Sequence, residues 1–517
     1  MSETTIVGPT YGNVIVEALT RHSGRDALVS GDRRVTYGEA ADTVSRIQQV
    51  LSNLGLSQGH GVAILSPNLP EVFLVQAATI LSGARYTGLH PLGSVDDHVF
   101  ICADADIDIL IVHPSYLDVG ATVTERSPSV RHLLTLGPAD TELDLVALCE
   151  ELTAKPLDAS PADGDLPAWV AYTGGTTGRP KGVTMSQRAL VQGASLLAAS
   201  WDLPETPRYL VASPITHAAV LPIVPTLSRG GTVILQQGFD PHRWSHAIEA
   251  ERANFSFIVP TMLSAVLDHT DLARVDTSSL ETLIYGAGPS SASRIEEAYG
   301  AFGPVLLQAY GQTECMGMAT TLRKDEHDPV NRPELLTSCG RPVSGVRVEL
   351  LDEDGHITGD GQVGEICVRS RAVMDGYRNR PEETAAALRD GWLRTGDLAT
   401  RDDAGFFRLV DRAKDMIVTG GFNVYSKEVE DVLNSDPSVA AAAVVGIPDE
   451  KWGERVVAYV VPRSGAAVDT TSLSALVKEK KGSHQAPKSI AVVDALPLTL
   501  AGKIDKKLLR ANHAGPT

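Results

Sequence analysis

Short apolar runs rich in β-branched residues alternate, from about residue 59, with longer stretches in which apolar residues recur at helical spacing. The run GVAIL at 61–65 predicts a buried strand, residues 70–84 predict a helix, and DILIV at 108–112 predicts the next strand. The same alternation of strands and helices recurs later in the chain. Strands are expected at 232–236, 255–260, 280–288 and 305–311, and helices at 241–253, at 261–269 and from the end of the 280–288 strand to residue 298. Such alternation is typical of parallel sheets covered by helices, so the pattern predicts an α/β fold.

The pattern changes twice in the last third of the chain. After about residue 338, VRVELLDEDGH and GEICVRS predict antiparallel strands joined by Asp/Gly turns. From about Asp411, the strand-like MIVTGG is followed by the helix-like KEVEDVLNS and by two further apolar runs, VAAAAVVGIP and VVAYVVP. We therefore expect a separate, small α+β domain in this region.

Composition narrows the class of protein. The 517-residue chain carries a net charge of −19, and 43% of its residues are apolar. The length predicts more than one domain, and the acidic surface argues against nucleic acid or an anionic membrane as the main partner. The sequence contains no apolar window long enough for a membrane span, no signal peptide, and five cysteines without metal-ligand or redox spacing. These features predict a cytoplasmic protein without an integral membrane segment, and they leave open whether it forms a homodimer.

The first chemical signal is the motif TGGTTGRPKG at 173–182. Glycines let backbone N–H groups turn toward one anion, while threonine hydroxyls and a lysine add donors and positive charge. The motif is not a Walker A loop, because no GK[ST] closes it. Two interpretations stay open at this point, a phosphate-binding loop and a glycine-rich hairpin. The candidate ligands are Thr173, Gly174, Gly175, Thr176, Thr177 and Lys181.

Five motifs, in this order, resemble the superfamily of acyl- and aryl-CoA synthetases, peptide-synthetase adenylation domains and luciferases: TGGTTGRPKG, YGQTE at 310–314, TGD at 395–397, DRAKDMIVTGGFNV at 411–424 and PLTLAGKIDKK at 497–507. The resemblance covers essentially the whole chain and is greatest to bacterial fatty-acyl-CoA synthetases, through GWLRTGD and KDMIVTGGFNVYSKEVE. It implies ATP, Mg²⁺ and coenzyme A. It also implies an N-terminal domain of layered sheets and helices at 1–411, with a β-barrel subdomain at about 336–411, and a small mobile C-terminal domain at 412–517.

The resemblance assigns a nucleotide site. Tyr310 would stack on adenine, Thr313 would bond phosphate, and Glu314 would hold Mg²⁺. Asp397 and Arg412 would hold the ribose hydroxyls. Four small residues are also expected to lie close to the nucleotide or the acid: Gly286, Ala287, Gly288 and Gly311. Without the resemblance, Tyr310 would be interpreted as a buried strand end and Asp397 as part of a glycine turn.

A second group of residues is implied in the reaction itself. The matching positions are Thr173 and Glu314 in the ATP site, His217 near the reacting carboxylate, Lys503 as the lysine used in adenylation, Lys414 as the hinge, and Gly420 and Gly421 as the turn near pantetheine. A lone histidine among apolar residues is often structural, so His217 keeps that alternative. Lys506 and Lys507 are expected on a solvated charged face.

The predicted activity is that of an ATP-dependent acyl-CoA ligase. The acid would form acyl-AMP with release of pyrophosphate, and a thiol would then displace AMP. Residues 211–220 contain no acidic side chain to pair with an ammonium, which argues against amino acids and favours an apolar acid, with fatty acids first and aryl or polycyclic acids as alternatives. A carrier protein as thiol partner, a luciferase-like monooxygenase and a non-catalytic nucleotide-binding protein are the competing classes.

Two positions depart from the commonest family pattern. Gly174 stands where serine is usual, which removes one hydroxyl donor from the phosphate loop. The SPITHAAV segment lacks the usual aromatic residue before His217, which predicts an altered acid pocket.

Overall fold

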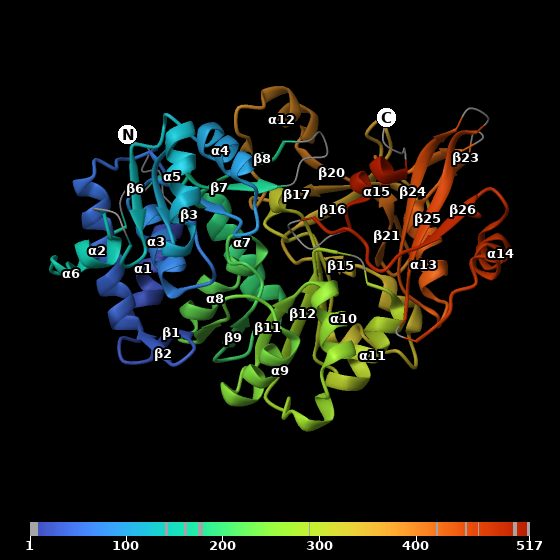
Figure 1. Cartoon of the computed structure of the whole chain (residues 1–517), viewed down its shortest axis with the longest axis horizontal. Helices are drawn as coiled ribbons and strands as arrows, with labels where there is room; N and C mark the ends of the chain where they lie inside the picture. Colours follow the sequence, from blue (N-terminus) through green and yellow to red (C-terminus); the bar gives the residue numbers. More distant parts are fainter. Residues whose placement is uncertain are drawn as a thin grey trace, which may run out of the picture.

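The computed structural model describes residues 9–139, 143–159, 163–173, 179–288, 290–419, 422–449, 452–463, 465–499 and 504–513. Four β-sheets and their helices make up these parts of the chain (Figure 1). The N-terminal elements lie on one side of the molecule in Figure 1, and the C-terminal elements lie on the opposite side.

The largest sheet has nine strands in the order β15-β14-β13-β12-β11-β9-β10-β1-β2. Its strands from β13 to β1 are parallel, while β2, β14 and β15 are antiparallel to their neighbours. The strand bounds are Asp26–Ser30 (β1), Arg33–Thr36 (β2), Arg208–Val211 (β9), Thr232–Leu235 (β10), Phe255–Ile258 (β11), Thr282–Gly286 (β12), Leu306–Tyr310 (β13), Thr320–Leu322 (β14) and Arg341–Pro342 (β15). The parallel strands expected between 232 and 311 are therefore confirmed, as are the connecting helices Pro241–Ala250 (α9), Pro260–His269 (α10) and Ala292–Phe302 (α11).

The second sheet has seven strands in the order β18-β8-β7-β4-β3-β5-β6. The strands from β7 to β6 are parallel, and β8 and β18 are added antiparallel at one edge. The bounds are Gly61–Leu65 (β3), Arg85–Leu89 (β4), Ile107–Val112 (β5), His132–Thr135 (β6), Pro167–Thr173 (β7), Lys181–Ser186 (β8) and Gly376–Tyr377 (β18). The edge strand β18 comes from a distant part of the sequence and brings Tyr377 beside the hairpin of the glycine-rich motif.

Helix α3, Pro70–Leu81, is buried at every residue except Glu71. A helix that is apolar all round packs inside a protein, and its residues share one core cluster with strands of both large sheets. The remaining helices of this part are Tyr11–Thr20 (α1), Tyr37–Asn53 (α2), Val95–Asp104 (α4), Leu117–Arg126 (α5), Leu145–Glu150 (α6), Gln187–Ser200 (α7) and Ile223–Ser228 (α8). The predicted α/β architecture is confirmed.

The third sheet is antiparallel throughout, as predicted from the changed pattern after residue 338. Strands β16, β17, β20 and β19 follow one another, and β21 pairs with β20. The bounds are Arg347–Leu351 (β16), Gly364–Arg369 (β17), Leu388–Arg389 (β19), Trp392–Arg401 (β20) and Phe407–Arg412 (β21), with helix α12 at Pro381–Ala387. Closure of this sheet into a barrel stays a prediction.

The fourth sheet belongs to a smaller α+β unit with hydrophobic clusters of its own. Its strands are Ile417–Thr419 (β22), Phe422–Val424 (β23), Val439–Asp449 (β24), Gly453–Pro462 (β25) and Ser489–Val492 (β26), and its helices are Ser426–Asn434 (α13), Thr470–Lys481 (α14) and Lys506–His513 (α15). A large N-terminal part and a small C-terminal part are thus confirmed, while the domain limits 1–411 and 412–517 stay predictions. Within the described ranges, no helix is long and apolar enough to cross a membrane.

Candidate active site

The glycine-rich motif connects β7 and β8. These strands form an antiparallel hairpin in which Thr173 is paired with Lys181. The predicted ligands between them, Gly174, Gly175, Thr176 and Thr177, lie outside the described residues. The two interpretations of the motif are therefore compatible, because a hairpin holds Thr173 and Lys181 at the two ends of a candidate phosphate loop.

Asp397 is the centre of a hydrogen-bonded group next to the end of β13. The Tyr310 hydroxyl and Gln312 Nε2 each donate to its Oδ2 at 2.8 Å, and Arg412 Nε lies 3.0 Å from its Oδ1. Asp397 and Arg412 face each other on the neighbouring strands β20 and β21. Only 7% of the Asp397 side chain is exposed, so these donors stabilise a buried carboxylate. The structure brings together three predicted residues and adds Gln312, which the motif YGQTE contains but which was not singled out.

The two residues before Asp397 lie in an irregular part of strand β20 and fix its orientation. Gly396 adopts a φ of +71°, a conformation that favours glycine, and its N–H donates to Oε1 of Glu365 at 2.8 Å. The Thr395 hydroxyl donates to the Ile366 carbonyl at 2.7 Å and accepts from the Asp397 N–H at 3.1 Å. The motif TGD therefore acts as a structural unit whose first two residues aim the third.

The Tyr310 phenol is a permanent donor in this group. Burial, and then the charge of Asp397, raise the pKa of Tyr310 well above its ordinary value. The phenol therefore keeps its proton at physiological pH and donates to the carboxylate. The stacking of adenine on this ring stays a prediction.

Glu314 lies in the short 3₁₀ turn Thr313–Cys315, directly after β13. The Tyr377 hydroxyl donates to its Oε1 at 2.8 Å. From the residues that the structure describes, no hydrogen bond reaches the other oxygen, Oε2. A half-buried carboxylate with one oxygen available suits a hard divalent cation, so Glu314 fits the predicted role of a Mg²⁺ ligand, with Thr313 in the same turn.

Lys181 is held by two residues that the sequence did not indicate. Its ammonium forms an ion pair with Glu383 of α12 and lies 5.1 Å from the centre of the Tyr377 ring. The same tyrosine therefore contacts both the lysine of the phosphate motif and the candidate metal ligand Glu314.

The small residues at the ends of β12 and β13 are needed for backbone packing, in addition to their predicted place near the ligand. A Cβ on Gly286 would lie 2.3 Å from the carbonyl oxygen of Ala309 in β13, and a Cβ on Gly311 would lie 2.3 Å from the backbone of Gly317. Ala287 adopts a φ of +64°, which is costly for a residue with a Cβ. The approach of neighbouring backbone thus requires both glycines, and a role of 286–288 toward a ligand stays a prediction.

His217 begins the 3₁₀ turn Ala218–Val220. Its Nδ1 lies 2.9 Å from the Thr216 hydroxyl, and its ring meets His90 edge-on, with centroids 5.0 Å apart. Burial lowers the pKa of His90, so that ring is neutral at neutral pH. His90 was not predicted, because nothing in the sequence places the loop after β4 beside SPITHAAV.

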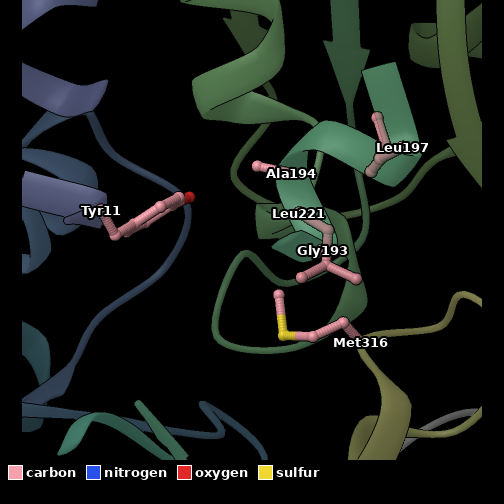
Figure 2. A pocket seen from close by; sticks show the side chains of 6 residues that line it. All are labelled: Tyr11, Gly193, Ala194, Leu197, Leu221 and Met316. Atoms are coloured by element: carbon pink, nitrogen blue, oxygen red, sulfur yellow. The ribbon is translucent and has the colours of Figure 1, made fainter. Parts of the chain in front are cut away.

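Residues of α1 and α7, together with Leu221 and Met316, surround a small apolar pocket that has no room for a water molecule (Figure 2). Met316 follows Glu314 by two positions, and a Cβ on Gly193 of α7 would lie 2.9 Å from its Cε. The flexible thioether of Met316 therefore closes one side of the pocket. The lining residues are Tyr11, Gly193, Ala194, Leu197, Leu221 and Met316.

The predicted hinge and the residues of the small unit are only partly described. Lys414 is exposed in the turn between β21 and β22. Lys503, Gly420 and Gly421 lie outside the described residues, although Leu498 and Ile504, on either side of 500–503, form a β-bridge. Their roles stay predictions.

The expectation that Lys506 faces solvent is wrong. Its Nζ lies 2.7 Å from Glu430 Oε1 and donates to the Ser426 hydroxyl at 2.6 Å, and only 16% of the side chain is exposed. Ser426 in turn donates to Asp411 through its N–H and its hydroxyl. Lys506 therefore joins α15 to α13 and, through Ser426, to β21, whereas Lys507 is exposed as predicted.

Comparison with known proteins shows the family. The model of the AMP-binding enzyme matches residues 15–378, and that of the AMP-binding enzyme C-terminal domain matches residues 428–503. The chain is similar to the medium/long-chain-fatty-acid–CoA ligase FadD8 of Mycobacterium tuberculosis, with 45% identity over 97% of this chain and 90% of the relative. It is also similar to feruloyl-CoA synthase of Amycolatopsis sp, with 37% identity over 94% of this chain and 95% of the relative.

Among solved structures, the amide bond synthetase McbA from Marinactinospora thermotolerans superposes with a TM-score of 0.89 at 36% identity, covering 97% of this chain and 99% of that chain. These matches confirm the predicted superfamily and the predicted class, an AMP-forming ligase. From the two family models and the relatives that span nearly its whole length, the chain belongs to the AMP-binding enzyme family.

Proposed function

We propose that this protein is an ATP-dependent acid–CoA ligase that activates a fatty acid as its acyl-adenylate and transfers the acyl group to coenzyme A. The observation that carries the proposal is the group formed by Tyr310, Asp397 and Arg412, which places an aromatic ring beside a buried carboxylate. Its Oδ2 already accepts two hydrogen bonds, while its Oδ1, next to Arg412, has a lone pair for a ribose hydroxyl. The similarity to a fatty-acid–CoA ligase over 97% of the chain supports the acid and the thiol.

In the first step, a carboxylate oxygen of the acid attacks the α-phosphorus of ATP, and the bond to pyrophosphate breaks. Thr173 and Lys181 would hold the triphosphate from the ends of their loop, and Lys503 would neutralise charge that develops on the phosphoryl oxygens. Mg²⁺, held by Glu314, would supply further charge neutralisation. Because the residues mainly position reactants, the step needs no protein nucleophile.

In the second step, the thiol displaces AMP from the acyl carbon. Rotation of the small unit about Lys414 would bring the turn at Gly420 and Gly421 to the thiol's path. His217 would orient the acid or the entering thiol, and His90 packs against its ring.

The SPITHAAV segment supports an acid without an amino group, because it contains no acidic residue to pair with an ammonium. The pocket between α7 and Met316 has an apolar lining but no free volume, so an acid chain could enter there only if the flexible Met316 side chain moved. Aryl acids are the nearest alternative, since feruloyl-CoA synthase and indoleacetate–CoA ligase are among the relatives.

A second candidate function is amide bond formation, in which an amine takes the place of the thiol. It is favoured by the similarity to McbA, which is 36% identical and shares the fold over 97% of this chain. Both candidates share the adenylation step and differ only in the nucleophile that enters second. A carrier-protein thiol is a third acceptor of the same kind.

One experiment separates these candidates. The enzyme is incubated with ATP, Mg²⁺ and a panel of fatty, aryl and polycyclic acids, and pyrophosphate release and products are followed by mass spectrometry with coenzyme A, with an amine, or with neither. We expect acid-dependent pyrophosphate release, strongest with fatty acids, and acyl-CoA as the product. Amides formed in preference to thioesters would overturn the choice of acceptor, and no pyrophosphate release with any acid would overturn the ligase.

A further inference from the structure

A single tyrosine links the two parts of the candidate ATP site that meet the triphosphate. Tyr377 donates its hydroxyl to Oε1 of Glu314 at 2.8 Å, while the ammonium of Lys181 lies 5.1 Å from the centre of its ring. Lys181 and Glu314 are 133 positions apart in the sequence, Lys181 on strand β8 and Glu314 in the 3₁₀ turn after β13, so the spacing between them depends on such a cross-link.

The backbone around Tyr377 is built to hold this ring in place. Tyr377 lies on β18, which pairs with β8 so that Tyr377 is opposite Val183. Its N–H donates to the Thr384 hydroxyl at 2.9 Å, and a Cβ on the preceding Gly376 would lie 2.8 Å from Cγ2 of that threonine. The edge strand is thus fastened to α12 on one side and to the phosphate hairpin on the other.

Glu314 is fastened to the same segment through its backbone. The Met374 N–H donates to the Glu314 carbonyl at 2.8 Å, three residues before the tyrosine that bonds its side chain. Main chain and side chain of Glu314 are therefore positioned together by residues 374–377.

The chemistry of the tyrosine suits both contacts. The Tyr377 hydroxyl is the donor in its hydrogen bond to Oε1, because a carboxylate oxygen only accepts. A hydrogen bond to Oε1 leaves Oε2 for a cation. The face of the ring attracts the Lys181 ammonium. Lys181 also forms an ion pair with Glu383, and a phosphate oxygen of bound ATP could take the place of that carboxylate.

We propose that Tyr377 is a positioning residue for the adenylation step: its hydroxyl orients Glu314 toward the metal ion, and its ring holds Lys181 at the distance from Glu314 that one Mg²⁺·ATP requires. The proposal rests on the proposed function, because it takes Glu314 as the metal ligand and Lys181 as the phosphate ligand. A merely structural tyrosine would affect folding stability and leave metal affinity unchanged.

The test separates the hydroxyl from the ring and needs no turnover. Mg²⁺ is titrated by calorimetry into enzyme saturated with a non-hydrolysable α,β-methylene analogue of ATP. We expect Tyr377→Phe, which keeps the ring, to weaken Mg²⁺ binding about tenfold, since a hydrogen bond to a charged group is lost. We expect Tyr377→Leu, which removes the ring as well, to weaken the analogue about fivefold more than Tyr377→Phe does, since the contact with Lys181 is lost.

Two controls make the outcome decisive. Tyr37→Phe removes another buried hydroxyl, which donates to the Leu227 and Gly231 carbonyls far along the chain, and it should leave Mg²⁺ affinity unchanged. Glu314→Gln should weaken Mg²⁺ at least as much as Tyr377→Phe. Wild-type Mg²⁺ affinity in Tyr377→Phe, with a loss in Glu314→Gln, would overturn the role of the hydroxyl and leave the proposed function standing. Wild-type affinity in Glu314→Gln would overturn the metal assignment itself, and equal analogue affinities in the phenylalanine and leucine variants would overturn the role of the ring.

Discussion

Replacing Asp397 by asparagine removes the charge at the centre of the candidate ribose site and changes little else in shape. An asparagine Oδ1 can still accept from Tyr310 and Gln312, which now donate to Oδ2 at 2.8 Å. Arg412 loses its charged partner, and the asparagine Nδ2 would be a second donor facing Arg412 Nε. Because Asp397 is only 7% exposed while 43% of the Arg412 side chain is exposed and can turn toward water, we expect a cost to folding of about 1–3 kcal/mol. The variant should still fold, since domains are stable by about 5–15 kcal/mol, and urea titration checks this before ligand binding is measured.

The expected loss follows from the hydrogen bond that the charge would make to a ribose hydroxyl. A bond to a charged group contributes about 1.5–3 kcal/mol, and each 1.4 kcal/mol is tenfold in affinity. We therefore expect the KM for ATP to rise between about tenfold and about a hundredfold. Because acyl-AMP carries the same ribose, the affinity for supplied acyl-AMP should fall by a similar factor.

The assay compares the two half-reactions in one variant. Pyrophosphate release gives the KM for ATP, and thioester formation from synthetic acyl-AMP gives the KM for the intermediate. Glu314→Gln is the matched control, since acyl-AMP lacks the β- and γ-phosphates and only the first half-reaction should suffer. An Asp397→Asn variant that loses ATP affinity but binds acyl-AMP like the wild type would refute the ribose assignment, as would an unchanged KM for ATP.

Three further changes test other parts of the site. Lys503→Ala should abolish acyl-AMP formation and spare thioester formation from supplied acyl-AMP; equal losses in both assays would contradict the alternation of the small unit. Gly193→Leu must displace Met316, because a Cβ at position 193 is already 2.9 Å from Met316 Cε. If the acid chain runs between α7 and Met316, kcat/KM for the longest accepted acids should fall about tenfold while that for short acids does not, and an unchanged chain-length profile would show that the chain does not run there. Lys506→Met leaves Glu430, which is only 9% exposed, without its cation, so urea titration should show a free energy of unfolding lower by about 3–5 kcal/mol. Most of this stability should be regained in Lys506→Met/Glu430→Gln. A double variant no more stable than the single one would mean that the two residues do not act as a pair.

The regular elements were predictable because burial leaves a simple pattern in the sequence. The run at 61–65 is buried at all five positions as a central parallel strand, which is why continuous apolar residues identified it with correct bounds. The short edge strands Arg341–Pro342, Gly376–Tyr377 and Leu388–Arg389 have two residues each, and all of these except Gly376 are exposed or half-buried, so no periodicity could indicate them. The antiparallel addition of β18 to β8 is a long-range pairing that sequence spacing does not encode.

In the candidate site, too, local motifs could be predicted from the sequence and long-range contacts could not. The motifs located Tyr310, Asp397 and Arg412 because each lies in a recognisable short pattern, and the structure brings these three together. Tyr377 was missed because its partners Glu314 and Lys181 come from distant parts of the chain.

The error at Lys506 has a physical cause of the same kind. A run of charged residues normally indicates solvent, but the first turn of α15 directs Lys506 and Lys507 to different faces, and only the fold shows that Glu430 lies on one of them.

The central claim, activation of the acid through an adenylate, is tested most directly with an acid labelled with ¹⁸O in both carboxylate oxygens. If a carboxylate oxygen attacks the α-phosphorus, the later displacement by coenzyme A leaves that oxygen on AMP. Mass spectrometry of the released AMP should then show one ¹⁸O per molecule, with the other label in the acyl-CoA carbonyl. AMP without label, formed alongside acyl-CoA, would contradict the account.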